Sequence, residues 1–190
     1  MIQIRKAKKE AAPVIADMIM EAMNHECCQW FAGPDHTLGD FRHLMTQLVV
    51  RDDSQYSYTN TLVAVDTDTD EAIAGIAVSY DGARLHELRK TFVDGAREAF
   101  GIDYSGIADE TQAGELYIDS LCVASEYRHR GIATSLLHAT IDKGHKMGLP
   151  TGLLVDVGNP KAEALYNNVG FRFVGNSEWG GHKMRHLVHE

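Results

Sequence analysis

The segment YRHRGIATS, residues 127–135, combines residue types that bind anions. Two arginines, Arg128 and Arg130, come just before Gly131, and an apolar run with helical spacing follows. The first turn of a helix leaves backbone N–H groups unpaired, and the helix dipole favours negative charge there. Gly131 lets the backbone approach a ligand, small Ala133 keeps the turn uncrowded, and the arginines add charge-assisted hydrogen bonds. This pattern predicts a diphosphate site.

The pattern Arg-x-x-Gly-x-Ala is short, and two other kinds of phosphate-binding loop are also rich in glycine. The Gly-Lys-Ser/Thr ending of a nucleotide P-loop is absent after Gly131, and so is the full Gly-x-Gly-x-x-Gly fingerprint of dinucleotide binding. The meaning of the pattern therefore depends on the elements that surround it.

Apolar periodicity predicts the elements that position this segment. The expected strands are residues 1–7, 61–66, 71–80, 115–123, 152–157, 171–175 and 181–188. The expected helices are residues 10–23, 38–52, 84–100, 133–148 and 160–169. Residues 25–37 read as an irregular, aromatic loop. The polar TDTD between the second and third strands predicts an antiparallel hairpin.

The helix over residues 160–169 has the clearest end signals. Asn159 is a good N-cap, Pro160 suits the first helical position, and Gly170 suits the left-handed position after the last turn. The strand over 115–123 is apolar on both sides and is therefore expected at the centre of the sheet. Together the elements predict an α/β fold with a mixed, mostly antiparallel central sheet and helices on both faces.

Length, charge and cysteine content limit the function. The 190 residues suit one domain, with a helical insertion expected at about 84–112, and no apolar run is long enough to span a bilayer. The net charge of −9 argues against a nucleic-acid partner and favours a cationic small molecule or peptide amine. Three cysteines and the lack of an apolar leader predict a cytoplasmic protein.

No metal is expected, because His25, Cys27, Cys28 and His36 match no usual zinc spacing. The histidines near the end, His182 and His186, share a predicted strand face and are either acceptor-site residues or exposed polar positions. Edge strands at the end of the chain make a homodimer a further expectation.

Two segments resemble a known family. VASEYRHRGIATSLL is similar to the acyl-CoA-binding motif Arg/Gln-x-x-Gly-x-Gly/Ala of the GNAT superfamily of acetyl-CoA-dependent N-acetyltransferases, and NPKAEALYNNVGF resembles its second signature, with the usual tyrosine. The 26-residue step from Ala133 to Asn159 leaves room for the helix and strand between the two motifs. The resemblance implies a GNAT-like fold and acetyl-CoA as acyl donor, without a metal.

The resemblance also implies how the donor would bind. Backbone amides from His129 to Ala133, with Thr134 behind them, would hold the diphosphate, and Leu121 and Val123 would pair with the pantetheine arm through main-chain groups. Asn159 would contact the arm from the other side. The residues expected to bind the cofactor are Leu121, Val123, Arg128, His129, Arg130, Gly131, Ile132, Ala133, Thr134 and Asn159.

Tyr166 is the expected general acid, near the thioester sulfur, as in similar proteins. Some relatives have a catalytic glutamate where this chain has Tyr117, so the role of base falls to Glu115 or Asp119, which share a strand face with Tyr117 by period two. Trp30, Phe31 and Tyr117 are expected to contact the acceptor, with the helix over 84–100 beside them.

The resulting hypothesis is an N-acetyltransferase that moves the acetyl group directly to a primary amine of a small molecule or peptide. Two alternatives remain open at this point. One is a non-catalytic acyl-CoA-binding or regulatory module on the same fold, and the other is a transferase that uses a different acyl group or acceptor.

Overall fold

Seven strands form one mixed sheet in the computed structural model, which describes residues 1–190. The strands lie in the order β1-β2-β3-β4-β5-β7-β6, and only the β4–β5 pair is parallel. Their bounds are β1 Ile2–Lys6, β2 Thr61–Asp66, β3 Ala72–Asp81, β4 Leu116–Val123, β5 Thr151–Asp156, β6 Arg172–Trp179 and β7 His182–His189. The predicted fold class is confirmed, and β4 is the central strand.

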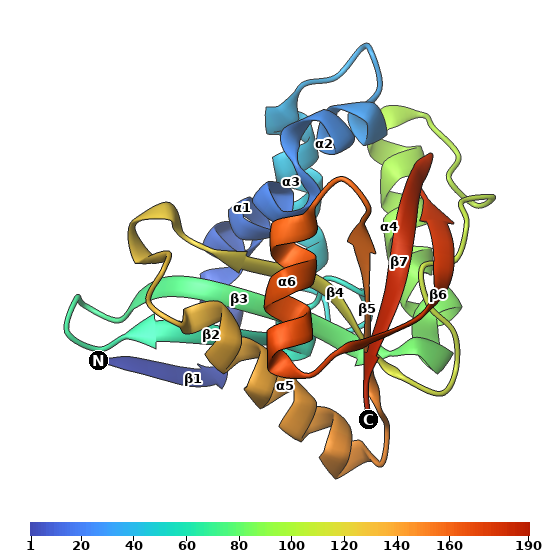
Figure 1. Cartoon of the computed structure of the whole chain (residues 1–190). Helices are drawn as coiled ribbons and strands as arrows, with labels where there is room; N and C mark the ends of the chain where they lie inside the picture. The colour runs from blue at the N-terminus through green and yellow to red at the C-terminus, as the bar shows by residue number, and fades with distance from the viewer.

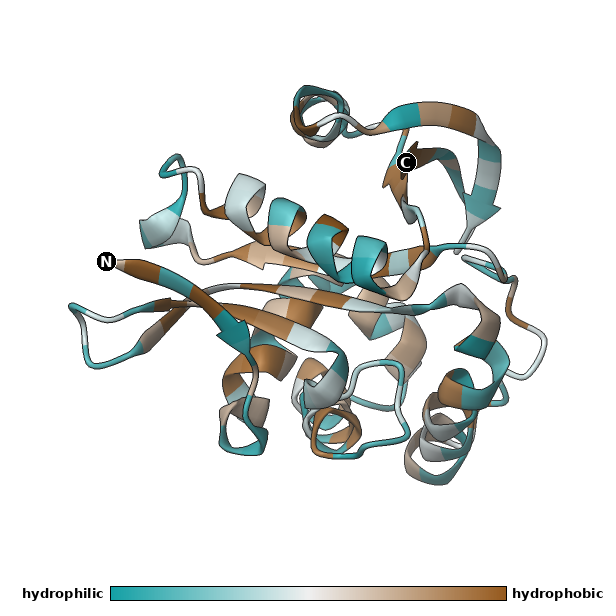
Figure 2. Ribbon diagram, turned by 90° about the horizontal axis from the view of Figure 1, so that it is seen from below, coloured by the Kyte–Doolittle hydropathy of each residue, from teal (hydrophilic) through white to brown (hydrophobic).

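Helices cover both faces of this sheet (Figures 1 and 2). Helices α1 to α4 lie on one face of the sheet, and α5 and α6 lie on the other. Side chains of α1 to α4 form one core cluster with side chains of β2 and β3. Helix α5 packs against the side chains of β2 to β5 that point to the opposite face. Their bounds are α1 Ala12–Met23, α2 His25–Ala32, α3 Leu38–Val49, α4 Leu85–Phe100, α5 Ile132–Met147 and α6 Pro160–Val169.

The predicted loop over residues 25–37 is wrong in its first part, since His25–Ala32 form α2. The side chain of Asn24 accepts a hydrogen bond from the Cys27 N–H at 2.8 Å and caps the helix. Buried Cys28, Phe31 and Ala32 recur at helical spacing, which gives the short helix one apolar face. Asn24 and this spacing are the signals in the sequence that identify it.

The central strands β4 and β5 pair over only three residues each and then separate. Residues Leu116–Ile118 of β4 pair with Thr151–Leu153 of β5, but β4 continues to Val123 and β5 to Asp156 without further pairing between them. The second half of β4 therefore has a strand neighbour on the β3 side alone.

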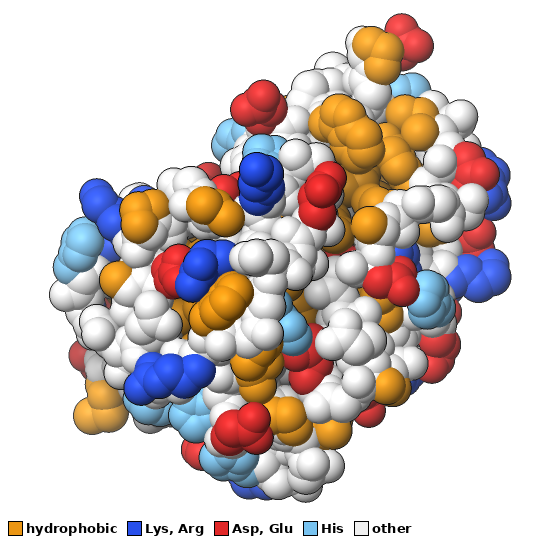
Figure 3. Space-filling view, turned by 45° about the vertical axis from the view of Figure 1, so that its right-hand side comes forward, with side chains coloured by type: hydrophobic (Ala, Val, Ile, Leu, Met, Phe, Trp, Pro, Cys, Tyr) orange, Lys and Arg blue, Asp and Glu red, His pale blue; other side chains and the backbone are white.

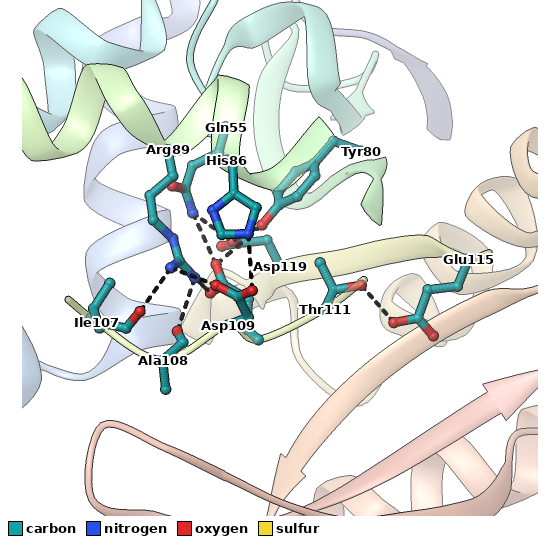
Figure 4. A network of polar contacts seen from close by, with 11 residues as sticks. Gln55, Tyr80, His86, Arg89, Ile107, Ala108, Asp109, Thr111, Glu115 and Asp119 are labelled. Atoms are coloured by element: carbon teal, nitrogen blue, oxygen red, sulfur yellow. Dashed lines mark hydrogen bonds and ion pairs between the residues drawn. The ribbon is translucent and has the colours of Figure 1, made fainter. Parts of the chain in front are cut away.

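A β-bulge lies where the two strands begin to separate. Val78 pairs with Ser120 and the next residue, Ser79, pairs with Ile118, so Asp119 is the extra residue of β4. The bulge shifts the alternation of side chains along β4: Ile118 before it and Leu121 after it both pack on the α5–α6 face. Asp119 is thereby directed to the other face, toward α4 and β3 (Figure 4).

Candidate active site

The β4–α5 turn presents a row of unpaired backbone donors. None of the N–H groups from His129 to Thr134 donates to a protein acceptor, and the first donor inside the helix is Ser135 N–H, which bonds Gly131 C=O at 3.0 Å. No side chain caps α5. His129 and Gly131 have positive φ angles of 62° and 76°, which curl the chain so that consecutive N–H groups converge. This geometry suits an anion with several oxygens, as the sequence predicts.

The arginines of this turn contact the protein around it. The Arg128 guanidinium donates to Val123 C=O at 3.1 Å and lies 3.5 Å from the Glu21 carboxylate. Arg130 donates to Glu126 C=O and stands over the ring of Tyr127. Both side chains are exposed, as is His129, so their charges lie at the rim of the row of N–H groups.

The second half of β4 directs backbone groups into the gap between β4 and β5. Ala124 N–H donates to Ala74 C=O, which is on β3. Because successive N–H groups point to opposite edges of a strand, Val123 and Leu121 direct theirs away from β3, toward the gap. These are the two residues predicted to pair with an extended arm, although Val123 C=O already accepts from Arg128.

A cavity of about 590 Å³ opens beside this gap. Five carboxylate residues line it, together with six aromatic residues and one histidine, and no lysine or arginine is among the lining residues. The carboxylate residues are Glu21, Glu26, Glu110, Asp119 and Asp156, and the aromatic residues are Trp30, Phe31, Tyr56, Tyr117, Tyr166 and Trp179. On the face drawn in Figure 3, apolar side chains gather in a hollow with acidic side chains at its margins.

Most of the predicted catalytic and acceptor residues meet at this cavity. Trp30, Phe31, Tyr117, Tyr166 and Asp119 all line it. Leu121 and Asn159 line it as well, so the predicted arm-binding residues border the same space as the predicted catalytic ones. The Asn159 side chain also caps α6 by accepting from Ala162 N–H at 3.2 Å.

Tyr166 lies on α6 and packs edge-to-face against Phe171. Its hydroxyl has no hydrogen-bond partner in the protein. Burial raises the pKa of Tyr166 to about 12, because the apolar surroundings disfavour the phenolate. The side chain is therefore protonated at neutral pH and available as a proton donor.

Asp119 lies at the cavity wall with an unusual set of neighbours. Burial, followed by the nearby charge of Glu110, raises its pKa to about 6. Ser120, Gln55 and Tyr80 donate hydrogen bonds to its two oxygens and oppose that shift. At neutral pH the carboxylate is mostly ionised and can accept a proton.

Glu115, the other predicted base, is placed elsewhere. It is buried, and its carboxylate accepts from the Thr111 hydroxyl at 2.6 Å and contacts His186 Nε2 at 2.7 Å. It is not among the residues that line the cavity, and Figure 4 shows its carboxylate bonded to Thr111, apart from the group around Asp119. Of the two terminal histidines considered, His182 borders the cavity and His186 pairs with Glu115.

Several cavity residues were not identified from the sequence. Glu110 lies in the irregular segment between α4 and β4, and Tyr56 precedes β2 in a stretch without periodicity. Behind the wall, Arg89 of α4 forms a buried ion pair with Glu110. Arg89 lies in the middle of an otherwise apolar helical face. An arginine at such a position indicates an internal carboxylate partner, and it is the one signal for this pair in the sequence.

Two further observations concern other site types. Nowhere in the structure do three or more His, Cys, Asp or Glu side chains gather closely enough to hold a metal ion. None of the helices combines the length and the apolar character that a bilayer crossing requires.

Comparison with known proteins identifies the family of this chain. A sequence model of the acetyltransferase (GNAT) family matches residues 20–171. The chain is 30% identical over 112 residues to acetyltransferase Atu2258 of Agrobacterium fabrum, a match that covers 58% of this chain and 81% of the relative.

Two solved structures are similar over nearly the whole chain. One is an acetyltransferase with a TM-score of 0.81 and 25% identity, covering 99% of this chain and 98% of that one. The other is an N-acetyltransferase from Staphylococcus aureus Mu50 with a TM-score of 0.79 and 22% identity, covering 98% and 99%.

Proposed function

Because the chain belongs to the GNAT family of acetyltransferases, we propose that it transfers an acetyl group from acetyl-CoA directly to a primary amine that carries a second positive charge. The observation that carries this proposal is the composition of the cavity. Five carboxylates and no lysine or arginine line a space that opens at the separation of β4 and β5. An anionic or neutral acceptor would gain little from such a lining, whereas a dication would be attracted to it.

The row of donors from His129 to Thr134 supports the choice of acetyl-CoA as donor. The GNAT fold is associated with acetyl-CoA binding, and in this chain the unpaired N–H groups provide a site for its diphosphate. Leu121 and Val123 offer strand-like backbone groups on the way from that site to the cavity. The donor's thioester end would then lie near Tyr166.

Asp119 and Tyr166 supply the two proton transfers that the reaction requires. An alkyl ammonium group with a pKa near 10.4 costs about 4 to 5 kcal/mol to deprotonate at pH 7, so a positioned base matters. Asp119 takes one proton from the ammonium, and the amine nitrogen forms its bond to the acetyl carbon as the carbon–sulfur bond breaks. Tyr166 protonates the departing thiolate and regains a proton from the second N–H of the former amine.

A matched pair of amines tests this proposal. Thiol release from acetyl-CoA would be measured with 1,5-diaminopentane and with 6-aminohexanoate, which share a primary amine and a similar chain but differ in the charge of the far group. We expect kcat/KM to be at least about 10-fold higher for the diamine, because a 10-fold change corresponds to about 1.4 kcal/mol, less than the attraction between two charges about 4 Å apart near a protein surface. Equal kcat/KM values for the two amines would contradict the proposal that the acceptor is a dication. Binding of CoA without any turnover would contradict the proposed acetyl transfer.

A further inference from the structure

Glu110 and Asp119 share the same two hydrogen-bond donors, although they are nine positions apart in the chain. Gln55 Nε2 lies 3.2 Å from Glu110 Oε1 and 3.3 Å from Asp119 Oδ2. The Tyr80 hydroxyl lies 3.2 Å from each of the same two oxygens. The two carboxylate oxygens are thus bridged by two common donors, one amide nitrogen and one hydroxyl.

While both carboxylates are ionised, the donors around this pair leave one contact without a hydrogen, so the pair has a place for one further proton. Gln55 Nε2 has two hydrogens and the Tyr80 hydroxyl has one, so three hydrogens serve four donor–acceptor contacts. A proton bound by one of the two carboxyl groups supplies a fourth hydrogen, because a protonated carboxyl can donate to the Tyr80 oxygen. Two adjacent carboxylates in a buried site also repel each other when both are ionised.

We propose that Glu110 and Asp119 act as one proton-sharing pair, in which Gln55 and Tyr80 bridge the two carboxyl groups and Arg89 is the ion-pair partner of Glu110. The pair then binds the proton removed from the acceptor amine as a unit, with Asp119 as the member nearest the β4–β5 gap. Glu110 is in this view a positioning residue that sets the proton affinity of Asp119. The inference rests on the proposed function for its role in catalysis, but the pair itself exists without substrate.

Arg89 determines how the charge is divided. Its guanidinium forms an ion pair with Glu110 Oε2, the oxygen turned away from Asp119, and also bonds Asp109 and the carbonyls of Ile107 and Ala108 (Figure 4). Glu110 is thus neutralised on one side only. Asp119 has no cationic partner, so the shared proton resides mainly on Asp119 when the pair holds one.

The other titratable groups near the pair do not supply positive charge. Tyr80 of β3, Tyr117 of β4 and Tyr56 ahead of β2 face the two carboxylates, and burial raises the pKa of each tyrosine well above its ordinary value. Cys27 of α2 faces Tyr56, and burial raises its pKa to about 11. All four are neutral near pH 7, which leaves Arg89 as the only charged group that counters the pair.

Carbon-13 NMR of the side-chain carboxyls of Asp119 and Glu110, titrated on the full chain without substrates, tests the pair. We expect the Asp119 carbon to report a step near pH 6, and the Glu110 carbon signal to change at the same step because the charge of its neighbour changes there. Glu110→Gln removes the neighbouring negative charge and should lower the Asp119 pKa by at least about one unit. Tyr80→Phe removes a donor to the ionised form and should raise it.

Asp109→Asn is the matched control, because Asp109 also binds Arg89 but is half exposed and does not contact Asp119. We expect it to move the Asp119 step by less than about 0.3 units, since solvent screens its charge. If Glu110→Gln does not fold, the change of the Asp119 step in Tyr80→Phe tests the proposal instead. A single Asp119 step near its ordinary value of about 4, or an Asp119 step that neither variant moves, would overturn the proposal. Because no acyl transfer is measured, that result differs from a failure of the proposed activity.

Discussion

At the scale of individual residues, burial changes the pKa values of the side chains at this site. Tyr166 and Asp119 are ordinary residue types, but the apolar surroundings of the cavity raise the pKa of both, to about 12 and about 6. Desolvation disfavours the charged form of each group, so the phenol stays protonated at neutral pH and the carboxylate binds a proton more readily than usual. Both shifts suit the roles that we propose, with Tyr166 as proton donor and Asp119 as proton acceptor.

Tyr166→Phe tests the donor. We expect kcat for 1,5-diaminopentane to fall by about 10²- to 10⁴-fold, the usual contribution of a positioned acid, while the affinity for CoA is retained. The Tm should barely change, because the hydroxyl has no partner in the protein and Phe keeps the contact with Phe171. Tyr58→Phe, outside the cavity, is the control for loss of a hydroxyl. Unchanged kcat in Tyr166→Phe would remove the residue from the mechanism.

At the scale of elements, the two ends of α5 have the same backbone conformation but different unpaired groups. Gly131 before the helix and Gly148 after it both have a left-handed backbone, with φ angles of 76° and 69°, and an added Cβ would meet no atom within 4 Å at either position. Substitution imposes similar strain at both ends. Only the N-terminal end carries the unpaired N–H groups and the favourable end of the dipole.

Gly131→Ala and Gly148→Ala therefore form a matched pair. Each should lower the free energy of unfolding by about 1 to 2 kcal/mol, the cost of a left-handed alanine. We expect only Gly131→Ala to weaken CoA binding, by roughly 5- to 10-fold, because relief of the strain moves the N–H groups that face the diphosphate. Isothermal titration with CoA measures both affinities. Equal weakening in the two variants would show that α5 stability, not the turn, controls binding.

At the scale of the whole molecule, the charge distribution suits the two ligands that we propose, which have opposite signs. The chain has a net charge of −9, and five of its carboxylates line the cavity, whereas Arg128 and Arg130 are at the rim of the β4–α5 turn. Surface fields decay over about 8 Å at physiological salt, so each ligand responds to the charges nearest its own site.

Salt dependence follows from this arrangement. With acetyl-CoA saturating, raising the ionic strength from about 0.05 to about 0.5 M should lower kcat/KM for 1,5-diaminopentane by roughly 10-fold, because salt screens the attraction between the dication and the cavity. The value for 6-aminohexanoate should change little or rise. Steady-state rates across a salt series check this, and parallel curves for the two amines would contradict electrostatic selection.

Much of the architecture was predictable because it depends on local sequence. The apolar periods of β4 and α5, and the cap signals at Asn159 and Gly170 around α6, match the structure, and the anion-binding turn lies between the predicted strand and helix. Helix α2 differs from the predicted loop, because its aromatic and cysteine residues are not typical of a helix and its cap, Asn24, is the one clear signal of its start. Because α2 is short, few repeats of the apolar period fit within it.

The order of elements and the row of backbone donors after β4 follow from the sequence, because periodicity, caps and a glycine turn act over a few residues. Three features depend on the folded chain: β4 and β5 separate after three pairs, a bulge turns Asp119 to the cavity, and Glu110, Gln55 and Tyr80 converge on it. These contacts join segments 39 to 64 residues apart, or lie in irregular chain, where spacing along the sequence carries no information about distance in space.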